Sequence, residues 1–382
     1  MPGPLSGFKI IEMVGIGPAP FASMMLADMG AEVLRVDRVS GGGFLSGGGG
    51  PADVLGRNRK SAAINIKDER GVAAVLDLVE QADGFIEGLR PGVMERLGLG
   101  PDVCLARNPG LVYGRMTGWG QSGAYKDDVG HDINYIAITG ALHTIGRKGE
   151  RPTPPVNYLG DFGGGGMLLA FGMVTALLER SRSGEGQVVD AAMCDGAALL
   201  SASIFGAAQA GAWNEEPGTN MLDTGSHFYD VFECKDGGYV SIGALEPQFY
   251  ANLLDVLGLA GEDLPHQMDS SAWPKLKERV EAIFKTKTRD EWCTAMEGRE
   301  ICFSPVLKMT EAPAHPHNAS REVFVEVEPG KYQPGPAPRF SRSEVGVSSL
   351  ASAPGSDTTE CLKAWGFDGT RIDTLREAGV IG

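Results

Sequence analysis

The chain of 382 residues is long enough to form two lobes, and its 42% hydrophobic and 22% charged residues are typical of a soluble globular protein. Its net charge of −15 argues against general binding to nucleic acid or membrane surfaces, and no run of about 18 apolar residues predicts a membrane span. Neither end carries a recognisable targeting signal, so we expect a cytoplasmic protein.

The six cysteines are scattered without C-x-x-C spacing, which is typical of reduced thiols rather than of a disulfide framework or a zinc site. His315 and His317 have no neighbouring cysteine or carboxylate cluster, and the proline between them favours a loop. The sequence therefore predicts no metal site.

The N-terminal part of the chain has the pattern of a parallel α/β layer. A buried strand is predicted over 8–14, a helix over 19–29 that ends at Gly30, and a second strand over 31–37. A strand, a helix and a second strand in this order predict a Rossmann-like layer.

The same segment partly resembles a dinucleotide-binding fingerprint. Gly15 and Gly17 follow the first strand, and Asp37 ends the second, where a ribose-binding acid would lie. Pro20 occupies the position of the third glycine, so the match is partial and NAD is not the favoured ligand. Arg38 follows at once, and its positive charge suits a phosphate or the face of an adenine ring.

The alternation of strands and helices then continues. Residues 41–50 are nearly all glycine and serine, which predicts a mobile surface loop. Strands are predicted over 61–66, 83–87 and 111–117, and helices over 68–81, 131–142, 167–179 and 191–210.

Basic residues recur at the ends of these units. Because the carboxyl ends of parallel strands line one crevice, we expect the basic side chains to gather there around a polyphosphate. They are Arg38, Arg57, Arg59, Lys60, Lys67, Arg90 and Arg96.

The pattern changes from residue 226. Two strands, 227–233 and 239–243, flank a turn at Asp236 and Gly237 and predict a β-hairpin. Helices are predicted to begin at Glu246 and to cover 273–284 and 289–296. We therefore expect a large domain over 1–195 that 330–382 completes, a small α+β domain over 226–312, and linkers over 196–225 and 313–329.

His131 and Asp161 are candidates for an acid/base pair. His131 lies at or just before a helix start, where a free backbone N–H near Asp132 would stabilise an oxyanion. The glycines at 163–166 would leave room for an acyl chain, and Glu246 could orient the histidine. The residues permit removal of a proton next to a thioester carbonyl, or attack by Asp161 as a nucleophile that forms an acyl anhydride.

Several motifs together resemble the class III CoA-transferase family, and within it the α-methylacyl-CoA racemases, over nearly the whole chain. The transferases share the aspartate that Asp161 matches but usually lack the histidine that His131 matches, which favours the racemases. The segments are Gly15–Pro18, Asp37-Arg38, Arg90–Gly92, Met116–Gln121, Gly130–Tyr135, Gly160–Gly164, Gly186–Asp190 and Glu246–Tyr250.

The resemblance implies interconversion of (2R)- and (2S)-2-methylacyl-CoA by 1,1-proton transfer through an enolate, with His131 and Asp161 as the two bases. It implies that Glu246 of the partner subunit pairs with the histidine, within an interlocked homodimer. It also implies an acyl-CoA substrate and no separate cofactor. The residues implied in CoA binding are Arg38, Lys67, Arg90 and Arg96.

Two other functions stay open at this point. The chain could transfer CoA between acids through an aspartyl anhydride at Asp161, as the transferases of the family imply, or it could bind acyl-CoA without catalysis. The natural acyl chain and the role of residues 41–50 are not determined by the sequence.

Overall fold

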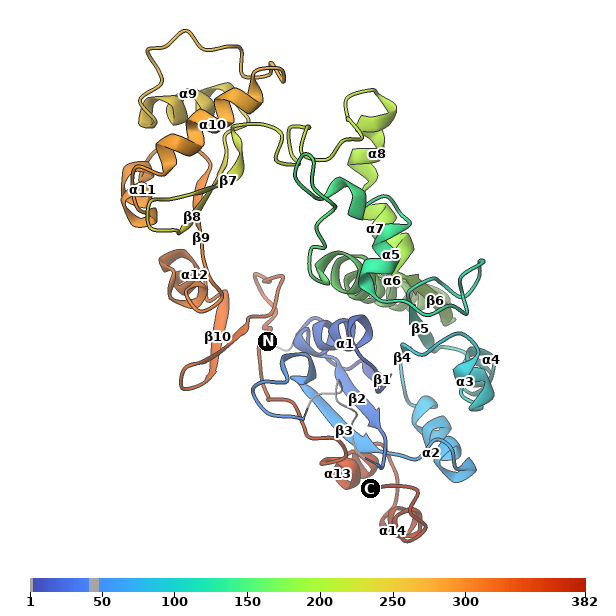
Figure 1. Cartoon of the computed structure of the whole chain (residues 1–382). Helices are drawn as coiled ribbons and strands as arrows, with labels where there is room; N and C mark the ends of the chain where they lie inside the picture. Colours follow the sequence, from blue (N-terminus) through green and yellow to red (C-terminus); the bar gives the residue numbers. More distant parts are fainter. Residues whose placement is uncertain (1–2, 41–47) are drawn as a thin grey trace. The chain divides into compact units, whose positions relative to one another are not determined.

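The computed structural model describes residues 3–40 and 48–382, and the contacts within it form two compact units (Figure 1). The large unit contains the chain up to Thr139, together with Val156–Leu200 and Ala319–Gly382, and the small unit contains Gly140–Pro155 and Ser201–Asn318. These boundaries differ from the expected ones chiefly at residues 140–155. That segment belongs to the small unit, where the Arg147 guanidinium forms an ion pair with the buried Asp230 carboxylate at 3.0 Å.

A six-stranded parallel sheet forms the centre of the large unit, in the order β3-β2-β1-β4-β5-β6. This is the strand order of a Rossmann fold, so the Rossmann-like prediction is confirmed. The strands are β1 (Lys9–Met13), β2 (Glu32–Asp37), β3 (Arg59–Ala63), β4 (Gly84–Glu87), β5 (Val112–Thr117) and β6 (Gln187–Ala192).

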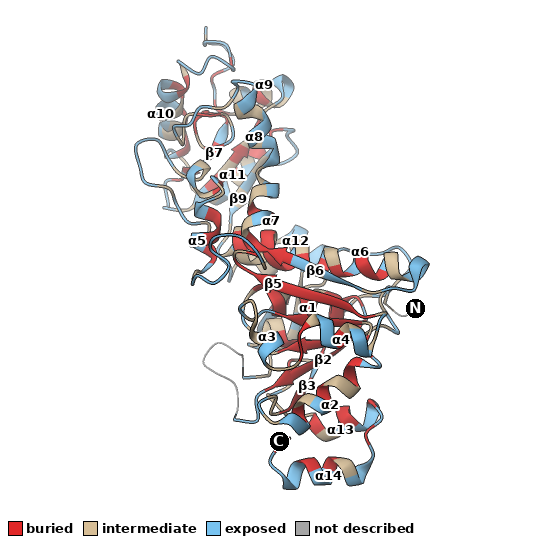
Figure 2. Cartoon of the chain, turned by 90° about the vertical axis from the view of Figure 1, so that its right-hand side faces the viewer, coloured by how far each residue is buried: buried red, intermediate tan, exposed pale blue. Residues whose placement is uncertain are grey.

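Helices cover both faces of this sheet, so the inner strands are buried along most of their length (Figure 2). One hydrophobic cluster packs α2, α4, α13 and α14 against one face, and a second packs α1, α5 and α6 against the other. The helices of the large unit are α1 (Pro18–Asp28), α2 (Glu69–Val79), α3 (Val93–Arg96), α4 (Pro101–Arg107), α5 (Asp132–Ala137), α6 (Leu168–Ser183), α7 (Met193–Leu200), α13 (Thr358–Ala364) and α14 (Gly369–Glu377).

The prediction of one helix over 191–210 is wrong. Residues up to Ala192 complete the edge strand β6, and two shorter helices follow, α7 and α8 (Ala202–Gln209). The polar and exposed residues of β6 hid the strand, because an edge strand does not need the apolar run that marks a central one.

The small unit contains a three-stranded antiparallel sheet of β7 (Tyr229–Glu233), β8 (Tyr239–Gly243) and β9 (Phe303–Val306). The predicted hairpin is confirmed. Helices α9 (Pro247–Val256), α10 (Trp273–Phe284) and α11 (Arg289–Met296) supply most of its remaining core.

The C-terminal segment returns to the large unit through a short hairpin, β10 (Phe324–Glu328) and β11 (Lys331–Pro334), which follows α12 (Pro316–Ser320). Arg57 ties this C-terminal segment to the rest of the large unit. Its buried guanidinium binds the Asp28 carboxylate at 2.6 Å and also donates a hydrogen bond to the side chain of Gln333 in β11. Further on, Ile381 forms a β-bridge with Ile64 at the end of β3.

One helical run, Tyr158–Ser183, is long and apolar enough to cross a membrane, with a mean hydropathy of 1.5. Its first part packs against α1 and α7 inside the large unit. Within its most apolar window, 44% of the run is buried inside the structure.

Candidate active site

Asp161 lies in a π-helix, Tyr158–Met167, that leads directly into α6. Its glycines are needed for packing: a Cβ on Gly164 would lie 2.7 Å from the backbone nitrogen of Ala197, and one on Gly166 would lie 2.7 Å from the carbonyl oxygen of Pro18. The expectation that these glycines leave room for an acyl chain is therefore wrong for 164–166. They let the π-helix fit between α1 and α7, which fixes the position of Asp161.

Asp132 joins the start of α5 to this π-helix. Its buried side chain accepts a hydrogen bond from the backbone N–H of Asp161 at 2.6 Å, through Oδ1. Gly160 makes the approach possible, because a Cβ there would lie 2.5 Å from the same oxygen. The side chain of Asp132 therefore has a structural contact that the sequence did not indicate.

His131 is the N-cap of α5, with an exposed side chain. Its backbone N–H donates to Oδ1 of Asn134 at 3.0 Å, while the N–H groups of Asn134 and Tyr135 donate to its carbonyl oxygen. The N–H of Asp132 lies in the first turn, where a helix offers it no acceptor. Its role as an oxyanion donor stays a prediction.

The structure brings His131, Asp132 and Asp161 together in the large unit. Burial raises the pKa of Asp161 above its ordinary value, and the Asp132 carboxylate raises it further, whereas the charge of His131 lowers it. A carboxyl whose pKa is raised toward neutrality is a better proton acceptor.

Asn157 is a residue of this site that sequence reasoning missed. Its side-chain Nδ2 donates to Oδ2 of Asp161 at 3.0 Å and opposes the effect of burial on the pKa. The spacing of four residues is the only signal the sequence offers, and that signal needs the segment to be recognised as helical.

Gly17 forms the wall on the other side of the Asp161 carboxylate. A Cβ on Gly17 would lie 3.2 Å from Oδ2 of Asp161, and the backbone φ of 67° at Gly17 also favours glycine. Gly17, which resembled part of a dinucleotide-binding fingerprint, thus allows the Asp161 carboxylate to lie close to the backbone.

Tyr135 forms the floor beside these groups. Its hydroxyl donates to the carbonyl oxygen of Gly130, and its ring packs edge-to-face on Trp119 with centroids 4.7 Å apart. Burial and the Asp161 charge raise its pKa, while the charge of Arg90 lowers it. The positive charge of Arg90 therefore acts on Tyr135.

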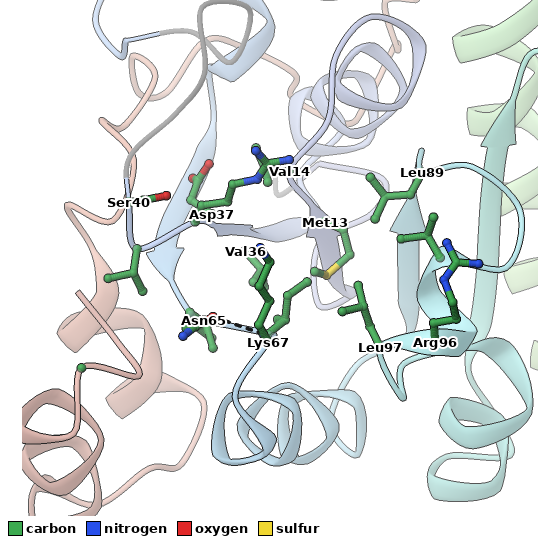
Figure 3. Close-up of a pocket in the computed structure, with 16 residues that line it drawn as sticks. Met13, Val14, Val36, Asp37, Ser40, Asn65, Lys67, Leu89, Arg96 and Leu97 are labelled. Carbon is green, nitrogen blue, oxygen red and sulfur yellow. Dashed lines mark hydrogen bonds between the residues drawn. The ribbon is translucent and has the colours of Figure 1, made fainter. Parts of the chain in front are cut away.

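A cavity of about 770 Å³ opens at the carboxyl ends of β1, β2 and β3. Asp37, Asn65 and Lys67 line one side of it, and Leu89, Arg96 and Leu97 line the other (Figure 3). Arg38 also lines it, so three of the four basic residues expected to bind CoA border one cavity. Arg90 does not line it.

Two other arginines of the predicted basic group point inward instead. Arg57 is paired with Asp28, and Arg59 with Glu12, and both guanidinium groups are buried. Neither arginine lines the large cavity, and both are engaged in these buried ion pairs, so their expected role in a polyphosphate site there is wrong.

Glu246 belongs to the small unit, where it is the exposed N-cap residue of α9. Its pairing with His131 stays a prediction. Within 3–40 and 48–382, no three His, Cys, Asp or Glu side chains are grouped as a metal site would require.

The chain is similar over nearly its whole length to proteins of known family. It is 42% identical to the α-methylacyl-CoA racemase of Mus musculus over 379 residues and 40% identical to that of Homo sapiens over 381 residues, each covering 99% of this chain and 97% of the relative. A CAIB/BAIF family protein from Brucella suis has the same fold, with a TM-score of 0.83 at 21% identity, covering 96% of this chain and 100% of the other.

The sequence profile of one family matches residues 5–358, which include His131, Asp132, Asp161, Glu246 and every lining residue of the large cavity except Gly379. The parallel sheet, the strand order and the extent of these matches agree with one another. The chain therefore belongs to the CoA-transferase family III.

Proposed function

We propose that this protein is an isomerase that interconverts (2R)- and (2S)-2-methylacyl-CoA. The observation that supports the proposal is the hydrogen bond of 2.6 Å from the N–H of Asp161 to Asp132, the residue that follows His131. It brings the two side chains that we propose as bases, His131 and Asp161, to one site, and the neighbouring cavity is lined by three basic residues. The identity of 42% to a mouse α-methylacyl-CoA racemase supports the same activity.

The chemistry moves one proton off a carbon and one proton back onto it. One base removes the Cα proton, and the electron pair spreads onto the thioester oxygen as an enolate. The N–H of Asp132 would donate to that oxygen. The conjugate acid of the other base then protonates the opposite face. No electrons leave the substrate, so the proposal calls for no redox cofactor.

The CoA portion would occupy the cavity of about 770 Å³, where Arg38, Lys67 and Arg96 offer charge-assisted hydrogen bonds to phosphates. Arg90, near Tyr135, would contact the substrate closer to its thioester. The net charge of −15 makes these local cations necessary, because the protein as a whole repels a polyphosphate.

We further propose that the working form is a cytoplasmic, interlocked homodimer in which Glu246 of the partner subunit contacts His131. An exposed apolar stripe along α6 supports an association: Met167, Phe171, Val174 and Leu178 are 53%, 69%, 39% and 61% exposed. Their spacing places them on one helix face, and a second copy of the chain is the occupant we propose. Light scattering that gives the mass of one chain would refute it.

Proton NMR in D2O tests the activity. Each enantiomer of 2-methylacyl-CoA is incubated with the protein without any acceptor acid, and the Cα–H signal and the configuration are followed. Loss of the signal together with inversion is the expected result. A silent spectrum that gives way to thioester exchange once a free carboxylate is added would assign CoA transfer through Asp161 instead.

Substitution of each base tests the mechanism. His131→Ala and Asp161→Ala should each abolish racemisation while the affinity for CoA stays nearly unchanged, since neither residue lines the large cavity. A comparable loss of affinity in both variants would contradict the assignment.

A further inference from the structure

One short segment of the large unit forms a side of the proposed CoA cavity. It covers residues 88–97 and leads from the end of β4 through α3. α3 has only four residues and follows Gly92, whose φ is 77°. A single helical turn is unstable by itself, so its position depends on contacts with the rest of the protein. The segment's side chains in the cavity wall are Leu89, Val93, Arg96 and Leu97 (Figure 3).

Arg115 binds this segment at both ends. It lies on β5 opposite Glu87, the last residue of β4, and its Nε donates to Oε1 of Glu87 at 2.9 Å. Its two terminal nitrogens donate to the carboxylate of Glu95 on α3, at 2.7 Å and 3.2 Å. The other oxygen of Glu87, Oε2, accepts the backbone N–H of Leu89 at 2.7 Å. One guanidinium thus fixes both the start of the segment and the helix that carries Arg96.

Arg115 is itself fixed in place. It is buried and lies on β5, which is hydrogen-bonded to β4 on one side and to β6 on the other. A planar guanidinium that donates two N–H bonds to one carboxylate fixes the direction of that carboxylate as well as its distance. The Glu95 side chain, by contrast, is 44% exposed, so its pairing adds little to the stability of the fold. The pair at Glu95 is therefore suited to orient α3 rather than to hold the core together.

The pairing with Glu95 controls the direction of Arg96. The two residues are neighbours in α3, and successive side chains of a helix point about 100° apart around its axis. Because Glu95 is bound to Arg115, the side chain of Arg96 is turned toward the cavity that it lines. The Arg96 guanidinium also lies close to the backbone, since a Cβ on Gly92 would lie 3.2 Å from its Nη1. A rotation of α3 would therefore move Arg96 out of the cavity wall.

The charge of Glu95 is unfavourable for a phosphate ligand. Glu95 precedes Arg96, a cation that we propose to meet a phosphate, in a protein whose net charge is already −15. A carboxylate at this place lowers the attraction for an anion. Neither Glu95 nor Arg115 is among the described residues that line the cavity. The orientation of α3 offers a benefit that offsets this repulsion.

We propose that Arg115 and Glu95 are positioning residues for the CoA cavity. Arg115, held by the sheet, sets the place of α3 through Glu95, so that Arg96 meets a phosphate of the ligand. Both residues act through Arg96 and not by touching the ligand. This inference rests on the proposed binding of CoA in the cavity and adds two residues to it.

Glu95→Gln is the sharpest variant, because charge and position predict opposite results. Glutamine has nearly the same shape but replaces one of the two acceptor oxygens with an NH2 donor, so the two-bond pairing with Arg115 is lost. Without the carboxylate charge, CoA should bind more tightly if Glu95 acts only through charge, and more weakly if it orients Arg96. The buried pair of Arg115 with Glu87 stays intact, which protects the fold.

Arg115→Lys is the second variant, and Asp83→Asn is the matched control. Lysine keeps a positive charge beside the buried Glu87 but has no planar fork to hold Glu95. Asp83 lies just before β4, at the other end of the same strand, and its carboxylate pairs with Arg180 at 2.6 Å. The control therefore weakens a carboxylate–arginine pair at the end of β4 that lies opposite to the cavity.

The experiment measures calorimetric affinity for CoA, together with KM and kcat for the 2-methylacyl thioester of CoA. It also measures kcat/KM for the same thioester of pantetheine, which carries none of the phosphates. Glu95→Gln and Arg115→Lys should each weaken CoA binding and raise KM about tenfold, as for the loss of one charge-assisted hydrogen bond, while kcat stays unchanged. Both should leave kcat/KM for the pantetheine thioester as in the wild type, and Asp83→Asn should change none of these values.

The outcomes separate the inference from the proposed function. Tighter or unchanged CoA binding by Glu95→Gln would overturn the inference, because Glu95 would then act through its charge or not at all. An equal loss with both thioesters would also overturn it, since the two residues would then support the fold in general rather than the position of Arg96. If the variants weaken CoA binding as expected but no thioester racemises, the proposed function fails and the inference stands. Racemisation with unchanged constants in both variants gives the reverse.

Discussion

Removing the amide of Asn157 should change the pH at which the protein works. Nδ2 of Asn157 donates to Oδ2 of Asp161 at 3.0 Å and so favours the ionised carboxylate. A hydrogen bond to a charged group contributes about 1.5–3 kcal/mol, and the partial exposure of Asp161 places this one near the lower end. Because about 1.4 kcal/mol corresponds to one pKa unit, Asn157→Ala should raise the pKa of Asp161 by about one unit.

The pH dependence of kcat/KM, measured from each enantiomer separately, tests this. For the enantiomer that Asp161 deprotonates, the carboxylate must be ionised, so the acidic limb of the profile should move up by about one unit. For the other enantiomer the same carboxyl acts as the acid, and the limb on which it loses its proton should move up equally.

Asn134→Ala is the matched control, because Asn134 belongs to the same site but accepts from the backbone N–H of His131. That variant removes an equivalent amide and should weaken the start of α5 without moving either limb. If Asn157→Ala lowered kcat/KM at every pH and left both limbs in place, Asn157 would be only a packing residue, and the reasoning from its hydrogen bond would be refuted.

Three further predictions concern stability and binding. Burial lowers the pKa of His227 to about 4, so the stability that depends on its neutral form is complete above the unfolded-state pKa of about 6.5 and is lost as pH falls toward 4. Urea unfolding should show the free energy of unfolding fall by about 3 kcal/mol over this range, and His227→Gln should remove that pH dependence. Gly164→Ala should destabilise the protein by about 1–3 kcal/mol, measured as a lower Tm, whereas Gly206→Ala, with nothing within 4 Å, should be neutral or stabilising. Lys67→Ala should raise KM about tenfold with kcat unchanged, and Lys60→Ala, outside the cavity, should change neither.

The large unit could be predicted well because its signals are local. Each inner strand is buried on both faces, which produces the apolar run that the sequence shows, and glycine or proline marks where α1 begins. His131 and Asp161 could also be singled out as candidates, since their neighbours form motifs of a known family. Local sequence signals therefore predict the order of the helices and strands and the candidate site residues.

The sequence failed where a residue's role depends on a distant partner. The glycines at 164–166 indicated space, yet the space is filled by α1 and α7. Arg57 and Arg59 matched the pattern of surface cations, but Asp28 and Glu12 draw them into the interior. A pattern of residue types does not show which neighbours the fold supplies.

The loop that joins β1 to α1 explains why these features lie together. In the strand order of the large sheet, β1 lies beside β4, where the direction of strand addition reverses, and ligands bind at such a point. Val14 lines both the large cavity and a second, smaller cavity, and Gly17 contacts Asp161 while it lines the smaller one. One short loop therefore borders the proposed CoA cavity, the candidate base and the second, smaller cavity. A side chain at Gly17 would disturb at least the last two together, so this position has to remain glycine even though no pyrophosphate is proposed to lie against it.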